Sequence, residues 1–370
     1  MLADIIGPAR LTQIARGAHV PSSFEQIDPI ADSRWGEFIL RHPRASVFHT
    51  PEWLSALQRT YGYQPVVFAL SHPGQPLQDA IPFCLVKSWL VRPRIVSLPF
   101  SDHAEPLVSN QENLLELLAF LEEGVADARW RSVELRPPCA MNSFTNWSNY
   151  HNGQQFVLHS LDLEPSLEKL FCRLNRDSTQ RKIRRALREG LRYQEGRSDG
   201  ELRKFFRLSV ITRRRKSLPP PPFDWFRNVV ACLGERAKIR IATTRSGELA
   251  GAILTLHFKD TLLFKYGASD SRFHNLGTMP FLMWQAIEEA KNSGASQFDF
   301  GRSETANLGL IRFKDHFGTK RSELTHKVFP ATSWEASAES WKMVLARKVF
   351  AKLPDRALIL AGRLIYPHIG

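Results

Sequence analysis

The chain has few cysteines, and none of them is placed for a structural site. Its 370 residues include four, which lie far apart and form no C-x-x-C pair: Cys84, Cys139, Cys172 and Cys232. No histidine stands near them at the spacing of a metal ligand. We therefore expect neither a disulfide framework nor a zinc site, and the sequence predicts a reduced, cytoplasmic protein without a metal.

Long hydrophobic runs are also missing. The apolar stretches fall short of the roughly 20 residues that a helix needs to cross a bilayer. The first residues, Met1-Leu-Ala-Asp-Ile-Ile, place an acid where a secretory signal carries positive charge. We therefore expect a protein that does not span the membrane and that touches it at most from the inner face.

Two common catalytic motifs are absent as well. The sequence contains no G-x-x-x-x-G-K-[ST] loop and no H-E-x-x-H pair, so it gives no support to a P-loop or a zincin interpretation. His49 and His103 stand alone, and an isolated histidine is more often structural than catalytic.

Positive charge is what the chain has in excess. Lysine and arginine number 50 against 37 aspartate and glutamate, which gives a net charge of +13. Such a balance favours an anionic partner or substrate: a nucleic acid, a phosphorylated molecule or a membrane surface. The hydrophobic content of 43% is enough for packed cores, so disorder is excluded as the main state.

Helix and strand signals alternate along the chain and repeat once in outline. In the first half, Thr50 and Pro51 mark the start of a helix, and short β-rich runs precede a helix at 114–128. In the second half, strands are expected at 238–243, 249–258, 261–268 and 297–300, with a helix at 279–293. The pattern predicts an α/β fold with these parts: a lead-in at 1–23, a first domain at 24–160, a second domain at 161–330 and a basic amphipathic helical tail at 331–370.

A basic stretch at 173–192 holds eight arginines and lysines against two acids. Ile183, Leu187 and Leu191 recur every four residues, so that one stripe is buried and the arginines point elsewhere, where guanidinium groups can bind phosphate oxygens. Arg181 and Arg185 are the candidates here. A solvated helix face is the alternative.

A second basic cluster, Arg213-Arg-Arg-Lys216, precedes four prolines at 219–222. Prolines stiffen a loop and can hold cations close together at a lower entropic cost, which makes Arg214 a candidate for substrate binding. A plain surface connection is the alternative.

The segment 271–284 joins a strand to a helix through Asn275, Gly277 and Thr278. Such a junction presents free backbone N–H groups and the positive end of a helix dipole to an anion. These three residues are therefore expected to bind the phosphates of a cofactor, although many strand-to-helix turns contain glycine for geometry alone.

The segment 298–319 is the most informative, because polar and charged side chains gather where a strand is expected to end. Arg302, Ser303 and Asn307 lie in the loop, and Lys314 follows in a short helical turn. Donors directed at a developing oxyanion, next to a carboxylate or imidazole, are what acyl transfer requires. A buried ion-pair network of Arg302 with Asp299 or Glu304 is the alternative.

These segments together carry a resemblance to a known family. The chain resembles the Fem-like branch of the GNAT acyltransferases, double-GNAT proteins that include peptidoglycan cross-bridge aminoacyltransferases and related acetyltransferases, some associated with exopolysaccharide systems. The matching segments are Phe48-His-Thr-Pro-Glu-Trp53 with Tyr61-Gly-Tyr, Leu98-Pro-Phe-Ser-Asp102, Gln180-Arg-Lys-Ile-Arg-Arg-Ala with Glu189-Gly-Leu, 213–222, and Asp299-Phe-Gly-Arg-Ser with Gly309-Leu-Ile-Arg-Phe-Lys-Asp-His-Phe-Gly318.

The resemblance implies two tandem GNAT-like domains with mixed sheets flanked by helices, and acyl transfer to an amine without a metal. The donor would be acetyl-CoA or an aminoacyl-tRNA, and the acceptor an amine of a cell-envelope or polysaccharide precursor that could be lipid-linked. The Phe-Lys pair of the family's last motif corresponds to Phe313 and Lys314. The pyrophosphate loop departs from the family pattern, as Arg272-Phe-His-Asn-Leu-Gly277.

We therefore expect Lys314 to polarise the donor carbonyl, with Phe313 and Asp299 beside it at the catalytic centre. Substrate-binding residues are expected to be Arg302, Ser303, Asn307, Arg181, Arg185, Arg214 and Asp102. The competing function is a non-catalytic protein that binds anions, RNA or membranes on a degenerate GNAT scaffold. For the tail, peripheral membrane contact competes with docking onto the protein's own core.

Overall fold

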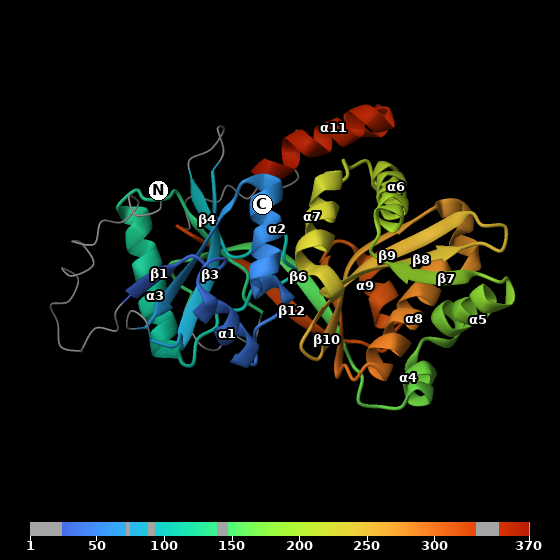
Figure 1. Ribbon diagram of the computed structural model, residues 1–370, viewed down its shortest axis with the longest axis horizontal. Helices are drawn as coiled ribbons and strands as arrows, with labels where there is room; N and C mark the ends of the chain where they lie inside the picture. The colour runs from blue at the N-terminus through green and yellow to red at the C-terminus, as the bar shows by residue number, and fades with distance from the viewer. Residues whose placement is uncertain (1–23, 72–74, 88–92, 139–146, 331–347, 370) are drawn as a thin grey trace.

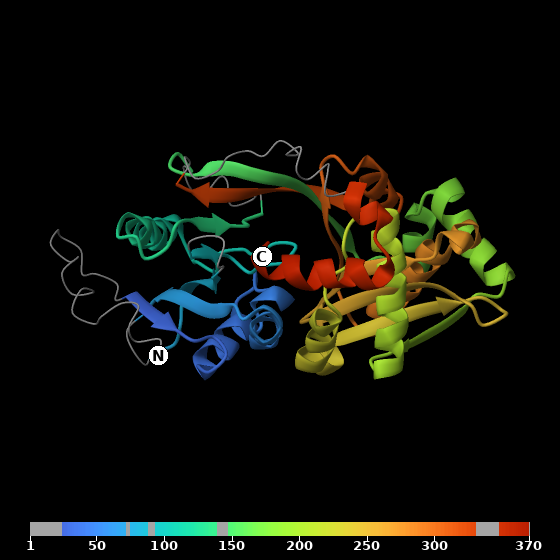
Figure 2. The same ribbon diagram turned by 90° about the horizontal axis from the view of Figure 1, so that it is seen from above.

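The computed structural model describes residues 24–71, 75–87, 93–138, 147–330 and 348–369. These residues build a single twisted sheet with helices on its faces (Figures 1 and 2). The described sheet has 12 strands in the order β1-β2-β3-β4-β5-β12-β6-β11-β10-β9-β8-β7. The α/β fold class expected from the sequence is confirmed.

The first half of the chain contributes short strands to the sheet and three main helices. The strands are β1 (Phe24–Ile27), β2 (Gln64–Leu70), β3 (Asp79–Val86), β4 (Arg94–Val96) and β5 (Val133–Leu135), and the helices are α1 (Ser33–Arg41), α2 (Pro51–Tyr61) and α3 (Gln111–Ala126). The start of α2 follows from the sequence, because the Thr50 hydroxyl accepts a hydrogen bond from the Trp53 N–H and Pro51 occupies the first turn. Gly62, at φ 70°, ends the helix.

The second half repeats this arrangement around longer strands. Its strands are β7 (Arg192–Gly196), β8 (Ala237–Thr243), β9 (Leu249–Phe258), β10 (Thr261–Ser269) and β11 (Gln297–Glu304). Its helices are α4 (Leu167–Arg173), α5 (Arg181–Arg188), α6 (Asp199–Arg215), α7 (Phe223–Leu233), α8 (Thr278–Asn292) and α9 (Leu308–Asp315). The strands expected at 238–243, 249–258 and 261–268 and the helix at 279–293 lie within a residue or two of these bounds.

Two long strands join the halves. β6 (His151–Asp162) pairs with β11, and β12 (Lys320–Phe329) pairs with both β6 and β5. A strand late in the chain thus completes the sheet of the first half, and a domain boundary at 160 falls at the end of a strand that both halves share. The division at 160 and 161 therefore stays a prediction.

The core also crosses between the halves. One buried cluster contains Trp53 and Leu57 of α2 together with Trp225 and Val229 of α7. The indole rings of Trp53 and Trp225 meet edge to face, with centroids 5.2 Å apart.

The C-terminal segment docks on the protein. α11 (Asp355–Ile365) buries Leu358 and Gly362, and a Cβ at Gly362 would lie 2.1 Å from the Pro220 carbonyl oxygen. The sequence places Trp341, Val344, Leu345 and Val349 on the apolar face of the predicted tail; the first three lie outside the described residues, and Val349 is exposed. Docking, the alternative considered for this tail, holds for one face of α11.

Candidate active site

A cavity of about 500 Å³ opens where two parallel strands part. β10 and β11 pair over Thr261–Leu263 and Gln297–Asp299. Their pairing ends there, although β10 continues to Ser269 and β11 to Glu304. A bulge at Phe264 in the pairing of β10 with β9, and one at Asp299 in the pairing of β11 with β6, turn the two strands away from each other. The residues beyond these bulges, Phe264 to Ser269 and Phe300 to Arg302, line the cavity.

Lys314 of α9 lies in the wall of this cavity and is 1% exposed. Its Nζ donates to the carbonyl oxygens of Gly301 at 2.8 Å and Arg302 at 3.0 Å. Burial lowers the pKa of Lys314 to about 8, and the charges of Asp102 and Asp299 offset this effect only in part. An ammonium has three N–H groups, so one remains for a ligand in the cavity.

Asp299 binds the same stretch of backbone as this lysine. Its carboxylate accepts from the Gly301 N–H at 2.6 Å and lies 3.2 Å from Nε2 of His103. Burial raises the pKa of Asp299, but the hydrogen bond and charge of His103 outweigh it, and the pKa is lowered. Asp299 does not line the large cavity; with His103 it lines a smaller polar one of about 300 Å³. Asp299, which the sequence predicts to be catalytic, is therefore linked to Lys314 only through Gly301. It accepts from the Gly301 N–H, whereas Lys314 donates to the Gly301 carbonyl.

Asp102, Lys265 and Arg302 form the charged floor of the large cavity. The Lys265 Nζ lies 3.1 Å from Oδ1 of Asp102 and also donates to the Phe100 carbonyl at 2.7 Å. Among the described residues, Oδ2 of Asp102 has no hydrogen-bond partner. It approaches Gly301 so closely that a Cβ there would lie 2.8 Å from it. Burial, and then the charge of Arg136, lowers the pKa of Arg302 to about 10.

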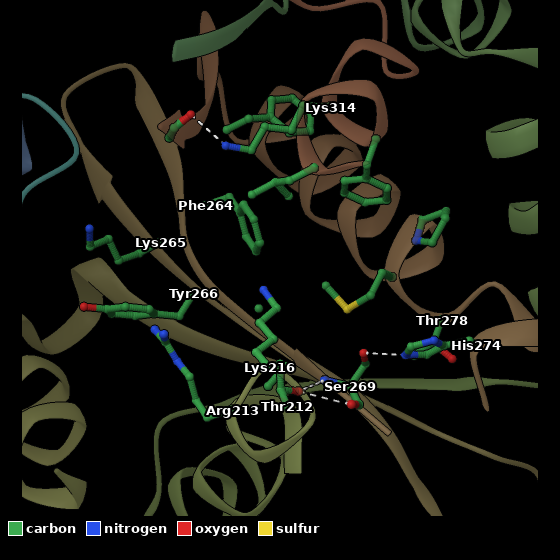
Figure 3. A pocket seen from close by; sticks show the side chains of 18 of the residues that line it. Thr212, Arg213, Lys216, Phe264, Lys265, Tyr266, Ser269, His274, Thr278 and Lys314 are labelled. Atoms are coloured by element: carbon green, nitrogen blue, oxygen red, sulfur yellow. Dashed lines mark hydrogen bonds between the residues drawn. The ribbon is translucent and has the colours of Figure 1, made fainter. Parts of the chain in front are cut away.

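The opposite end of the cavity is basic. Lys182 of α5 lines it together with Arg213, Arg215 and Lys216 from the end of α6 and with His274. Figure 3 shows Lys314 at one end and Ser269, His274 and Thr278 at the other, with Phe264 and Lys216 between them. Burial and the neighbouring arginines lower the pKa of Lys216. Cations held together in this way are suited to bind an anionic ligand.

The junction before α8 brings the basic helix to this end. Gly277 adopts φ +77°, and a Cβ there would lie 2.4 Å from the Lys182 carbonyl oxygen. Glycine therefore permits both the turn and the close contact with α5. Thr278 lines the cavity in the first turn of α8, whereas Asn275 is exposed in the preceding 3-10 helix η5 (Ser271–Leu276).

Several predicted residues lie outside the large cavity. Arg181 and Arg185 of α5 are not among its lining residues, and Arg185 faces Glu189 at 3.6 Å. Arg214 binds the C-terminal segment instead, through the Leu353 carbonyl at 2.8 Å and Asp355 at 2.7 Å.

Two further predicted residues have local roles. Asn307 caps α9 by accepting from the Leu310 N–H at 3.2 Å. Ser303 is 2% exposed, and its Oγ has no hydrogen-bond partner among the described residues. Phe313, by contrast, lines the cavity beside Lys314.

Sequence reasoning missed Lys265 and Tyr266. Within the cluster Arg213-Arg-Arg-Lys216 it selected Arg214, whereas the other three residues line the cavity. Lys265 directly follows the apolar run Leu262-Leu-Phe264, and a lysine there is a signal of a buried functional cation. Tyr266 accepts a hydrogen bond from the Trp225 indole at 2.9 Å, and burial raises its pKa above the ordinary value. This hydrogen bond joins β10 to α7, which are distant in sequence, so no local pattern reveals it.

One G-x-S-x-G spacing does occur, at Gly196-Arg197-Ser198-Asp199-Gly200, between β7 and α6. Ser198 is the N-cap of α6, and its hydroxyl and N–H contact the Glu201 carboxylate in a capping box. Ser198 is exposed and absent from the lining of the large cavity. The spacing serves helix capping.

The described residues contain no group of three or more His, Cys, Asp or Glu side chains that could hold a metal ion. Nor does any helix in the described ranges have the length and apolar character needed to cross a membrane.

Comparisons with known proteins agree with this fold. Residues 174–315 match the family model of the acetyltransferase (GNAT) domain. A crystal structure of FemX is similar with a TM-score of 0.66 at 15% identity, over 81% of this chain and 96% of that one. No curated protein matches the sequence.

Two other solved structures share the fold. A tandem GNAT protein from the clavulanic acid biosynthesis pathway has a TM-score of 0.55 at 12% identity, over 83% of this chain and 98% of that one. The C-terminal domain of a putative lysylphosphatidylglycerol synthetase from Agrobacterium fabrum has a TM-score of 0.52 at 12% identity, over 86% and 95%. Residues 174–315 therefore match the acetyltransferase (GNAT) domain, and the whole chain shares its fold with FemX and with the tandem GNAT protein.

Proposed function

We propose that the protein is an N-acyltransferase that moves an acetyl or aminoacyl group from an anionic activated ester to an amine of a cell-envelope or polysaccharide precursor. The observation that carries this proposal is the buried Lys314 ammonium at one end of a cavity whose other end is basic. An activated ester with phosphates fits both ends at once.

The basic end would hold the donor. Acetyl-CoA and aminoacyl-tRNA both present phosphates, and Lys182, Arg213, Arg215 and Lys216 supply cations within one cavity. The first turn of α8 adds the positive end of a 15-residue helix. The described residues therefore suit either donor.

Lys314 would act on the ester carbonyl. Its position is fixed by two backbone carbonyls, so its remaining N–H needs no rearrangement to meet the oxyanion that develops during attack. One such donor contributes about 3–4 kcal/mol to transition-state stabilisation. Arg302 also lines this cavity and adds positive charge.

The acceptor amine would approach the floor of the cavity. Its nitrogen forms a bond to the carbonyl carbon, and the bond from that carbon to the thioester sulfur or ribose oxygen of the donor breaks. The amine loses one proton, and the departing sulfur or oxygen takes one up. The unpartnered Oδ2 of Asp102 can accept that proton or an N–H hydrogen bond. Holding both reactants in one cavity contributes roughly 7–11 kcal/mol by orientation.

Mass spectrometry of reaction products tests the proposal. The purified protein is offered acetyl-CoA and a set of charged tRNAs, each with candidate amine acceptors. Turnover with one donor at physiological salt supports the proposal, and no product with any donor at any acceptor concentration contradicts it.

A second candidate function rests on the exposed arginines of α5. Arg181, Arg184 and Arg188 face solvent rather than the cavity, so they could bind an anionic polymer without catalysis. Binding that weakens steeply with salt, together with an absence of acyl transfer, would favour this function.

A further inference from the structure

The outer face of α11 combines exposed leucines with arginines. Leu360 and Leu364 are 55% and 64% exposed, and they lie one helical turn apart. Arg356 and Arg363 are exposed on the same face, while Leu358 and Gly362 on the opposite face are buried against the protein. These leucines form an apolar surface on a docked helix that the described residues leave exposed to water.

The charge of the segment complements an anionic surface. Lys348, Lys352, Arg356 and Arg363 stand against one acid, Asp355, which is paired with Arg214 at 2.7 Å. Ile369, 54% exposed, and Val349, 50% exposed, extend the apolar surface beyond both ends of α11. Leucines in the acyl boundary with lysine and arginine at headgroup level are the pattern of an interfacial helix.

The position of α11 places this face beside the cavity. In Figure 1, α11 lies at the outer edge of the molecule, above α6 and α7. Arg214 of α6 holds the start of α11, and the neighbouring Arg213 and Arg215 line the basic end of the cavity. A surface bound by α11 therefore lies close to the residues that would hold the donor.

We propose that the exposed face of α11 binds the surface of an anionic phospholipid bilayer and so brings the cavity to amines presented at that surface. The part of this statement that concerns the amine rests on the proposed function; the binding itself does not. Two leucines and four cations favour peripheral, reversible contact rather than permanent anchoring.

Vesicle co-sedimentation of the full chain tests the binding. We expect binding to vesicles of phosphatidylcholine with phosphatidylglycerol, little binding to phosphatidylcholine alone, and loss of binding as salt is raised. Leu360→Ser with Leu364→Ser should weaken the partition coefficient about 100-fold, roughly tenfold for each leucine removed from the acyl boundary. Arg356→Gln with Arg363→Gln should reduce both the binding and its dependence on salt.

Leu40→Ser is the matched control, because Leu40 of α1 is 59% exposed and lies in the first half. It should bind vesicles like the original protein, and thermal melting should show that all variants are folded. Equal binding by the double leucine variant, or no binding to anionic vesicles by the original protein, overturns the proposal. A dimer that the leucine substitutions dissociate, without vesicle binding, would show that a second copy covers this face instead. Acyl transfer to a soluble amine reports on the proposed function separately.

Discussion

Lys314 is held in the cavity wall by backbone carbonyls rather than by a carboxylate. Burial outweighs the charges of Asp102 and Asp299, so the pKa of Lys314 falls to about 8 while the side chain still carries a charge at neutral pH. The low dielectric of the site strengthens the electrostatic interaction of this ammonium with a substrate oxygen.

Replacing Lys314 should remove most of the activity. We expect Lys314→Ala to lose at least about 100-fold in kcat, because one donor to the oxyanion contributes that much. Lys314→Met fills the same space without the charge, so it separates lost packing from lost chemistry. Both variants should show the far-UV circular dichroism of the folded protein, and near-normal turnover by either would remove Lys314 from the mechanism.

The rate should also fall at alkaline pH. Lys314 donates only while it is protonated, so kcat should decrease as the pH rises through about 8. Amine acceptors by themselves would react faster at higher pH, because more of the amine is neutral. A rate that continues to rise between pH 8 and 10 would show that a protonated Lys314 is not required.

Asp299 should set the position of that alkaline limb. Its negative charge is one of the groups that raise the pKa of Lys314, so Asp299→Asn should move the fall in rate to lower pH. Asparagine can still accept the Gly301 N–H, so the backbone that holds Lys314 is preserved. Glu304→Gln removes an exposed carboxylate of the same strand and should leave the limb in place; an equal shift in both variants would count against the specific role of Asp299.

At the scale of elements, α5 and the turn before α8 meet at one glycine, Gly277. Gly277 lets the Lys182 carbonyl pass close to the η5 turn, and Lys182 then reaches the basic end of the cavity. These two segments and the end of α6, which are distant in sequence, thereby share one anion-binding end.

A methyl group at Gly277 should disturb both stability and donor binding. Gly277→Ala combines a positive φ with a clash against backbone and should lower the free energy of unfolding by roughly 2–3 kcal/mol. Gly294→Ala has a similar φ of +87° and open space around the added carbon, so it should cost about 1 kcal/mol. The donor KM should rise several-fold in Gly277→Ala alone. Equal unfolding energies, by urea titration, would show that the contact with Lys182 relaxes freely.

At the scale of the whole molecule, the two halves share strands and core. β12 pairs with strands of both halves, and Trp53 and Trp225 pack together between α2 and α7. Separate unfolding would have to break these pairings and expose both indoles, so the halves should unfold together.

Trp225→Ala should therefore lower the stability of the entire chain. We expect a single urea transition that shifts by about 3–5 kcal/mol, the usual cost of removing a buried tryptophan. Trp130→Ala, in a core cluster of the first half, should shift that same transition. Two transitions that respond separately to the two substitutions would show that the halves are independent.

The local pattern of the sequence determined much of the fold. Thr50 and Pro51 start α2 through a cap and a fixed φ, and the apolar runs of β8, β9 and β10 lie in the centre of the second half. These features depend on neighbours along the chain, which is why periodicity and capping predicted them. The charged strand β12 was missed, because Lys320–Phe329 shows no alternation and is a strand only through its partners on both sides.

The sequence also predicted the candidate site only in part. The polar residues that follow a strand at 298–319 pointed to Arg302 and Lys314, and the resemblance to the Fem-like family pointed to Phe313; all three line the cavity. Tertiary structure decided that Arg214 binds the C-terminal segment and that Lys265 pairs with Asp102. It also decided that Asp299 contacts the Gly301 backbone and does not line the large cavity. Residue type and spacing record what a side chain can do, whereas its partner and its burial are set by segments more than 100 residues away, which only the folded chain brings together.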